Sequence, residues 1–188
     1  MAAASPGSII RVPGSLVWNP TTLSGTPPFG GTYLGEVRNV RFKPNPKYRE
    51  IWAEELGSVV DSFYVGEGPC EFRAVLRYPD ADAITATAPK AIASGSSGIH
   101  WLFRPQGTTA NTRAGTSMVT RVGKLLFVPR AYVAHPMILI YAALPMLDPD
   151  LEIPLSWKDE YAVGMRFVGS PDSSGRVYDT GLRANLVI

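Results

Sequence analysis

The chain has 188 residues, of which 45% are hydrophobic and 18% charged, with 18 glycines and 17 prolines. This composition excludes a disordered chain and predicts one globular domain or two very small ones. Lys and Arg number 18 against 16 Asp and Glu, so the chain as a whole lacks the basic excess of proteins that grip phosphate backbones. The single cysteine, Cys70, excludes an intrachain disulfide and a multi-cysteine zinc module, and fits a reducing compartment.

The N-terminal half predicts strands separated by loops. Residues 19–32 are rich in Gly, Pro, Thr and Ser and predict a long loop, whereas 33–42 follow an extended pattern that predicts a strand. Residues 48–56 and 59–65 flank a Gly-Ser pair that suits a type II′ turn, so they predict a β-hairpin.

A two-residue turn fixes the register of this hairpin. It places Trp52 opposite Phe63 and Leu56 opposite Val59 on one face, and we interpret these four side chains as packing or assembly contacts. Both faces are mixed in polarity, which indicates that each meets more protein or a confined space.

The same register places Glu54 opposite Asp61, and like charges at opposite positions are destabilising. Two interpretations remain open. Either an arginine from a neighbouring strand compensates the pair, or both carboxylates face a lumen in which negative charge is favourable. The candidate arginines are Arg38, Arg41 and Arg73.

The rest of the chain is mostly predicted strand. Apolar and charged residues alternate over 70–78, which predicts a strand with Cys70 on its buried face. A short helix is predicted over 81–88 and a long loop over 91–117. Further strands are predicted over 118–129, 132–144, 152–157 and 161–168.

These elements predict a mainly β fold, a β-sandwich or barrel with one short helix and long loops. We predict a single domain over 1–188, with an N-terminal extension at 1–32 and the long loop at 91–117. No secretory signal is evident, and the apolar stretch 131–147 is too short to span a bilayer, so no membrane association is expected.

Neither catalysis nor metal binding is expected. His100 and His135 are the only histidines and have no companions at metal-ligand spacing, and no nucleophile elbow is present. We therefore predict no enzyme activity, no metal and no cofactor.

The order of elements resembles that of a known family. Residues 33–37, the hairpin strand with 57–66, the amphipathic strand and the short helix are followed by 125–129, 142–145 and an aromatic strand that leads to a Pro-Asp turn at 171–172. Over residues 30–188 this pattern is similar to the tail tube proteins of long-tailed bacteriophages.

The resemblance implies a structural virion protein. Six copies would close into a ring, and rings would stack into a hollow conduit for DNA, which passes through without specific binding. The implied partners are the chain itself, tape-measure, tail terminator and baseplate or tail-tip proteins, and the implied location is the virion tail after synthesis in the host cytoplasm. That Glu54 and Asp61 face the lumen is our own hypothesis.

Two alternatives remain open. One is another phage structural protein, for tail completion or capsid decoration, which would form a single closed oligomer. The other is a β-sandwich module that binds a carbohydrate or protein through exposed aromatics, with Trp18, Trp101 and Trp157 as candidates.

Overall fold

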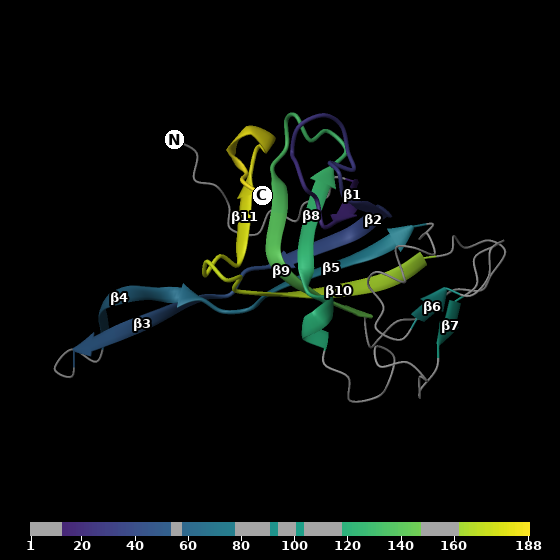
Figure 1. Ribbon diagram of the computed structural model, residues 1–188. Helices are drawn as coiled ribbons and strands as arrows, with labels where there is room; N and C mark the ends of the chain where they lie inside the picture. The colour runs from purple at the N-terminus through teal and green to yellow at the C-terminus, as the bar shows by residue number, and fades with distance from the viewer. Residues whose placement is uncertain (1–12, 54–57, 78–90, 94–100, 104–117, 148–161) are drawn as a thin grey trace.

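The computed structural model describes residues 13–53, 58–77, 91–93, 101–103, 118–147 and 162–188. The described part of the chain is almost entirely β, as predicted (Figure 1). Its elements are β1 Gly14–Trp18, β2 Thr32–Lys43, β3 Pro46–Ala53, β4 Ser58–Glu67, β5 Cys70–Arg77, β6 Ala91–Ala93, β7 Trp101–Phe103, the 3-10 helix η1 Met118–Arg121, β8 Gly123–Pro129, β9 Met137–Leu147, β10 Ala162–Ser170, β11 Tyr178–Gly181 and the 3-10 helix η2 Arg183–Asn185.

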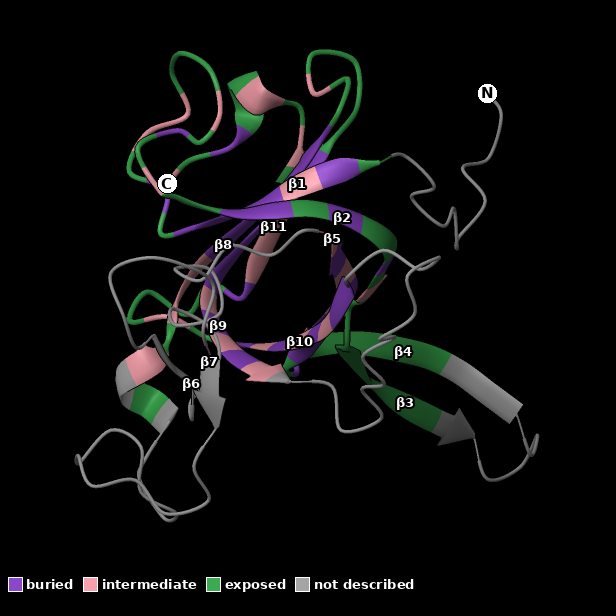
Figure 2. Ribbon diagram, turned by 90° about the vertical axis from the view of Figure 1, so that its right-hand side faces the viewer, coloured by how far each residue is buried: buried purple, intermediate pink, exposed green. Residues whose placement is uncertain are grey.

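Six of the strands form a closed barrel. They follow the order β10-β5-β2-β1-β8-β9, and β9 then pairs with β10 to complete the circle. Every neighbouring pair is antiparallel, and β11 adds to a part of β9 outside this circle. Figure 2 looks into the ring of strands. Closure leaves these six strands no open edge along the paired segments.

The barrel interior is filled by side chains from alternate positions of each strand. In β5 buried and half-buried residues alternate without interruption, which confirms the predicted amphipathic strand. Cys70 is fully buried, as predicted. The ring centroid of Phe72 lies 6.0 Å from that of Phe127 and 6.3 Å from that of Phe167, so strands on opposite sides of the barrel meet through aromatic contacts.

A second apolar cluster lies outside the barrel, against β8 and β9. Phe29 from the loop 19–31 and Leu186 near the C-terminus are both buried there with Leu126 and Leu139. The backbone N–H groups of Thr21 and Thr22 donate to the Phe29 carbonyl at 3.1 and 3.2 Å. The predicted loop is therefore confirmed, and it is folded onto its own barrel.

Several predicted boundaries need correction. The proposed N-terminal extension at 1–32 contains β1, which lies between β2 and β8 inside the barrel. The strand predicted over 132–144 begins only at Met137, because residues 131–134 form a turn in which Ala134 N–H donates to the Ala131 carbonyl. The long loop 91–117 contains the short pair β6 and β7. The helix predicted over 81–88 and the strand predicted over 152–157 lie outside the described residues.

Two phenylalanines provide a matched test of this core. Phe72 is 0% exposed and Phe63 is 52% exposed. We expect Phe72→Ala to lower the free energy of unfolding by about 3–5 kcal/mol, because it removes a buried ring and leaves a cavity. Phe63→Ala should change it by less than about 1 kcal/mol. Urea denaturation of both variants measures the difference, and equal losses would contradict the barrel core.

Candidate functional site: an exposed hairpin arm and an arginine face

The most prominent surface feature is the hairpin of β3 and β4, here called the arm. These strands form a separate two-stranded sheet whose strands pair only with each other. They contain 8 and 10 residues, which corresponds to a length of about 25–30 Å. Figure 1 shows the arm extending away from the barrel from the ends of β2 and β5. The predicted hairpin is therefore confirmed.

Its predicted register is wrong. Trp52 lies opposite Val59 and Arg49 lies opposite Phe63, so the predicted pairing of Trp52 with Phe63 does not occur. The register shifts twice, and each shift leaves one residue of β4, first Val65 and then Val60, without a partner across the hairpin. β3 ends at Ala53 and β4 begins at Ser58, so four residues separate the strands instead of two.

The observed register changes the neighbours of the predicted site residues. Asp61 lies opposite Ile51 instead of Glu54. Glu54 and Leu56 lie outside the described residues, as do the side chains of Trp52 and Val59, so their predicted roles stay predictions. Asp61 is exposed, and its carboxylate accepts a hydrogen bond of 2.7 Å from the Ser62 backbone N–H.

Large apolar and aromatic side chains are exposed along the arm. Phe63, predicted to pack in a core, is about half exposed, so a packing role within its own chain is wrong. Tyr48 and Tyr64 lie opposite each other with ring centroids 5.9 Å apart, and both are more than half exposed. Alternation places Ile51, Phe63 and Asp61 together on the other face, here called the Asp61 face. Such a surface is typical of an interaction site.

The base of the arm is fixed to the barrel. The Phe42 and Tyr178 rings make an edge contact at 4.9 Å, and the Tyr178 hydroxyl donates to Glu67 Oε1 at 3.4 Å. Burial, and then the Glu67 carboxylate, raise the pKa of Tyr178. The Gly68 backbone N–H donates to the Asn45 carbonyl at 2.7 Å. These contacts set the direction in which the arm leaves the barrel.

A second surface, here called the arginine face, lies on the outside of β2, β5 and β10. Arg41 is directly opposite Arg73, which is directly opposite Arg166, so three arginines form a row across three strands. Glu71 is the carboxylate of this row: it accepts hydrogen bonds from Arg73 Nε and, at 2.8 Å, from Arg166 Nε. The hydrogen bond from Arg73 and the charges of both arginines lower the pKa of Glu71 despite partial desolvation. Arg38, Lys43 and Arg77 extend the face along β2 and β5.

The predicted compensation of Asp61 by an arginine is not observed. Within the described residues Arg73 is paired with Glu71, and Asp61 has no ion pair with Arg38, Arg41 or Arg73. The sequence did not indicate the arginine face, because the net charge of +2 averages over the whole chain. The described residues hold 13 of the 18 Lys and Arg but only seven of the 16 Asp and Glu, so the folded barrel is much more basic than the chain average.

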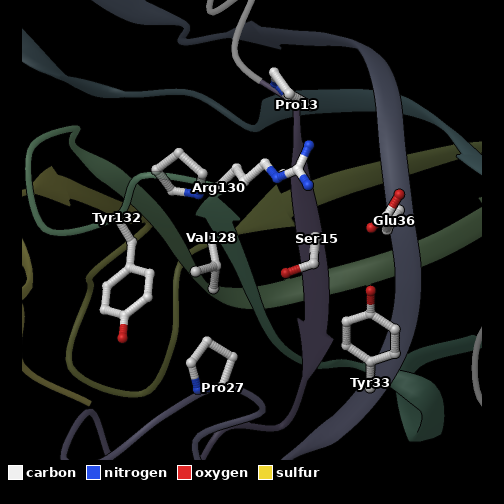
Figure 3. A pocket seen from close by; sticks show the side chains of 10 residues that line it. Pro13, Ser15, Pro27, Tyr33, Glu36, Val128, Arg130 and Tyr132 are labelled. Carbon is white, nitrogen blue, oxygen red and sulfur yellow. The ribbon is translucent and has the colours of Figure 1, made fainter.

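A shallow pocket lies where β1, β2 and β8 end (Figure 3). It has a volume of about 170 Å³, and its walls include Pro13, Pro27, Tyr33 and Tyr132. Figure 3 shows the Arg130 guanidinium reaching across it towards Ser15. Ligand pockets usually have volumes of about 300–1,000 Å³, so this one is too small for most ligands.

The remaining chemical candidates are structural where they are described. Burial raises the pKa of the Cys70 thiol to about 11, so it is a poor nucleophile near neutral pH. His135 is exposed, and His100 lies outside the described residues. No group of three or more His, Cys, Asp or Glu side chains suited to a metal occurs within the described ranges. Nor does this part of the chain contain a helix long and apolar enough to cross a membrane.

The candidate aromatics of a binding module are not displayed as such a module requires. Trp18 is buried in the barrel core, where its ring centroid lies 6.0 Å from that of Phe167. The side chain of Trp101 and the whole of Trp157 lie outside the described residues. The described structure therefore offers no exposed tryptophan for ligand stacking.

No protein-family model and no curated protein sequence match the chain. Among solved structures, the fold is similar to the sheath/tube terminator of the PVC extracellular contractile injection system in its extended state, with a TM-score of 0.41 and 7% identity over 96% of this chain and 99% of that chain. It is also similar to the tube-terminating cap of the anti-feeding prophage, with a TM-score of 0.40 and 6% identity over 97% of this chain and 95% of that chain.

The arginine row gives a prediction about acid stability. Because the pKa of Glu71 is lowered in the folded chain, its ion pairs stabilise the fold above the ordinary carboxyl pKa and lose this effect as the pH falls through the lowered value. We expect Glu71→Gln to lower the free energy of unfolding by at most about 1 kcal/mol at pH 7, since the pair is partly exposed.

Urea denaturation at pH 7 and at pH 3 tests this expectation. The difference between wild type and Glu71→Gln should shrink at pH 3 and at high salt. Glu50→Gln, an exposed carboxylate on the arm, is the matched control and should change stability little at either pH. A constant deficit at both pH values would contradict a role through charge.

Proposed function

We propose that this chain is a structural subunit of a phage tail or phage-tail-like tube, which joins copies of itself through the arm. The observation that carries the proposal is an exposed two-stranded hairpin on a barrel that is otherwise closed. In the full form of the proposal, six copies make a ring and rings stack around a conduit for DNA.

The arm needs a partner for reasons of hydrogen bonding. A two-stranded hairpin is at best marginally stable by itself in water, and both edges of the arm carry backbone groups without a strand partner. The barrel strands have used their own edges to close on one another. Association through the arm therefore satisfies backbone groups that the single chain leaves open to solvent.

The side chains of the arm support the same conclusion. Tyr48, Ile51, Phe63, Tyr64 and Val65 are all at least 41% exposed. Aromatic residues are enriched at protein interfaces, where they contribute a large apolar area. An arm that inserts into a neighbour makes a head-to-tail contact, and such contacts close into rings or continue as helical filaments.

The proposal assigns the chain no catalytic role and no cofactor. The family resemblance extends it to tape-measure, terminator and baseplate or tail-tip proteins as partners in the virion tail. The binding-module alternative is disfavoured by the buried Trp18 and the small pocket volume. A tail completion protein differs from a tube subunit in forming a single ring that does not stack.

Electron microscopy of the purified chain, beside its sedimentation profile, tests the proposal. We expect rings or tubes for the wild type. Phe63→Lys should reduce assembly at least about tenfold, because it places a charge in an apolar contact, while the melting temperature stays unchanged. Val133→Lys is the control, since Val133 is 81% exposed on the turn between β8 and β9.

Each outcome has a clear consequence. A monomer at all concentrations and salt conditions would reject assembly as the function. Rings that never stack would favour tail completion or a cap over a tube subunit. Equal assembly by Phe63→Lys and wild type would remove the arm from the contact.

A further inference from the structure

We propose that the arm of one copy docks with its Asp61 face on the arginine face of the next copy. This inference rests on the proposed function, because it names the surface that receives the arm. The occupant is a second copy of this chain, and the argument for it is charge and shape complementarity between two surfaces that the single chain leaves without a partner.

The charges of the two surfaces are opposite. From Glu50 to Asp61 the sequence contains four carboxylates and no Lys or Arg. The outward face of β2, β5 and β10 carries six cations, with Glu36 and Glu71 as its acids. The six are Arg38, Arg41, Lys43, Arg73, Arg77 and Arg166.

The arginine row is short of negative charge. Glu71 is hydrogen-bonded to Arg73 and Arg166, whereas Arg41 has no ion pair with any described residue and is exposed. Like charges directly opposite one another across strands are destabilising. A carboxylate from another chain relieves this repulsion, and Asp61 is exposed and has no cation paired with it in the described part.

Apolar groups are matched as well. Val75 and Val168 lie on the outward face, two residues along from Arg73 and Arg166, and both are half buried. On the Asp61 face, Ile51 and Phe63 are 41% and 52% exposed. Packing these side chains together adds hydrophobic contact to the charge pairs, as in interfaces that combine an apolar centre with polar surroundings.

The dimensions agree with sheet packing. Neighbouring strands lie about 4.8 Å apart, so the row from Arg41 to Arg166 spans about 10 Å, which is wide enough to receive a two-stranded ribbon. Two sheets that pack face to face keep a separation of about 10 Å, a distance that these side chains bridge.

The arm cannot reach the arginine face of its own chain. It leaves the barrel from Lys43 and Cys70, at one end of β2 and β5, and extends away from the strands that form the face (Figures 1 and 2). A contact between the Asp61 face and the arginine face must therefore join two copies, which is a head-to-tail arrangement.

A charge exchange between the two surfaces tests the inference on the full chain. Asp61→Arg and Arg41→Glu should each reduce ring formation at least about tenfold, because each places like charges in contact. The double variant should regain rings, and so should a mixture of the two single variants, since every contact in an alternating ring is then complementary. Sedimentation and electron microscopy provide the readout.

Two controls locate the contact. Glu50→Arg changes a carboxylate on the opposite face of the arm, and Arg130→Glu changes an exposed arginine far from β5 and β10 in the order of strands. Both should assemble as wild type does. Melting temperatures verify folding, and Asp61→Asn and Arg41→Gln replace any reversal variant that fails to fold, with an expected weaker and salt-sensitive loss of rings.

The outcomes separate this inference from the proposed function. Wild-type chains that never assemble overturn both. Rings that form equally with Asp61→Arg and Arg41→Glu overturn the docking while leaving assembly through the arm in place. Single variants that lose rings without rescue, or a stronger effect of Glu50→Arg than of Asp61→Arg, also overturn the docking.

Discussion

The closure of six strands into a barrel is the constraint on which the rest of this structure depends. Closure lets β10 pair with both β5 and β9, so the hydrogen bonds that an open sheet leaves at its two edges are used within the chain. The alternate residues of each strand then fill the interior, and Phe72, Phe127 and Phe167 meet there. Open strand edges remain only on elements attached to the barrel, and the arm is the longest of these in the described chain.

The features that the sequence predicted well are those with one buried face. β5 was predicted because burial against the barrel interior enforces a period of two, and the loop 19–31 because Gly, Pro and Thr exclude regular structure. The hairpin was predicted, but its register was not. The arm has no buried face to enforce one register, and the two shifts at Val65 and Val60 leave no trace in the alternation of residue types.

The arginine face was missed for a different physical reason. Net charge is a sum over the chain, whereas electrostatic recognition depends on where the charges lie. Arg41, Arg73 and Arg166 come from strands that are distant in sequence, and the barrel topology places them side by side. Pairing of β2 with β5 and of β5 with β10 was not evident from the order of elements, so the row became visible only with the fold.

The register also decides which role is open to Asp61. The predicted register placed it opposite Glu54, and the resulting acidic pair suggested a wall past which DNA slides. The observed register places it opposite Ile51 and beside Phe63, in an apolar setting that resembles an interface more than a wetted wall. A carboxylate bound to an arginine of the next copy is screened from a lumen, so the two roles exclude each other for Asp61. If the docking holds, the negative charge of a conduit must come from other residues.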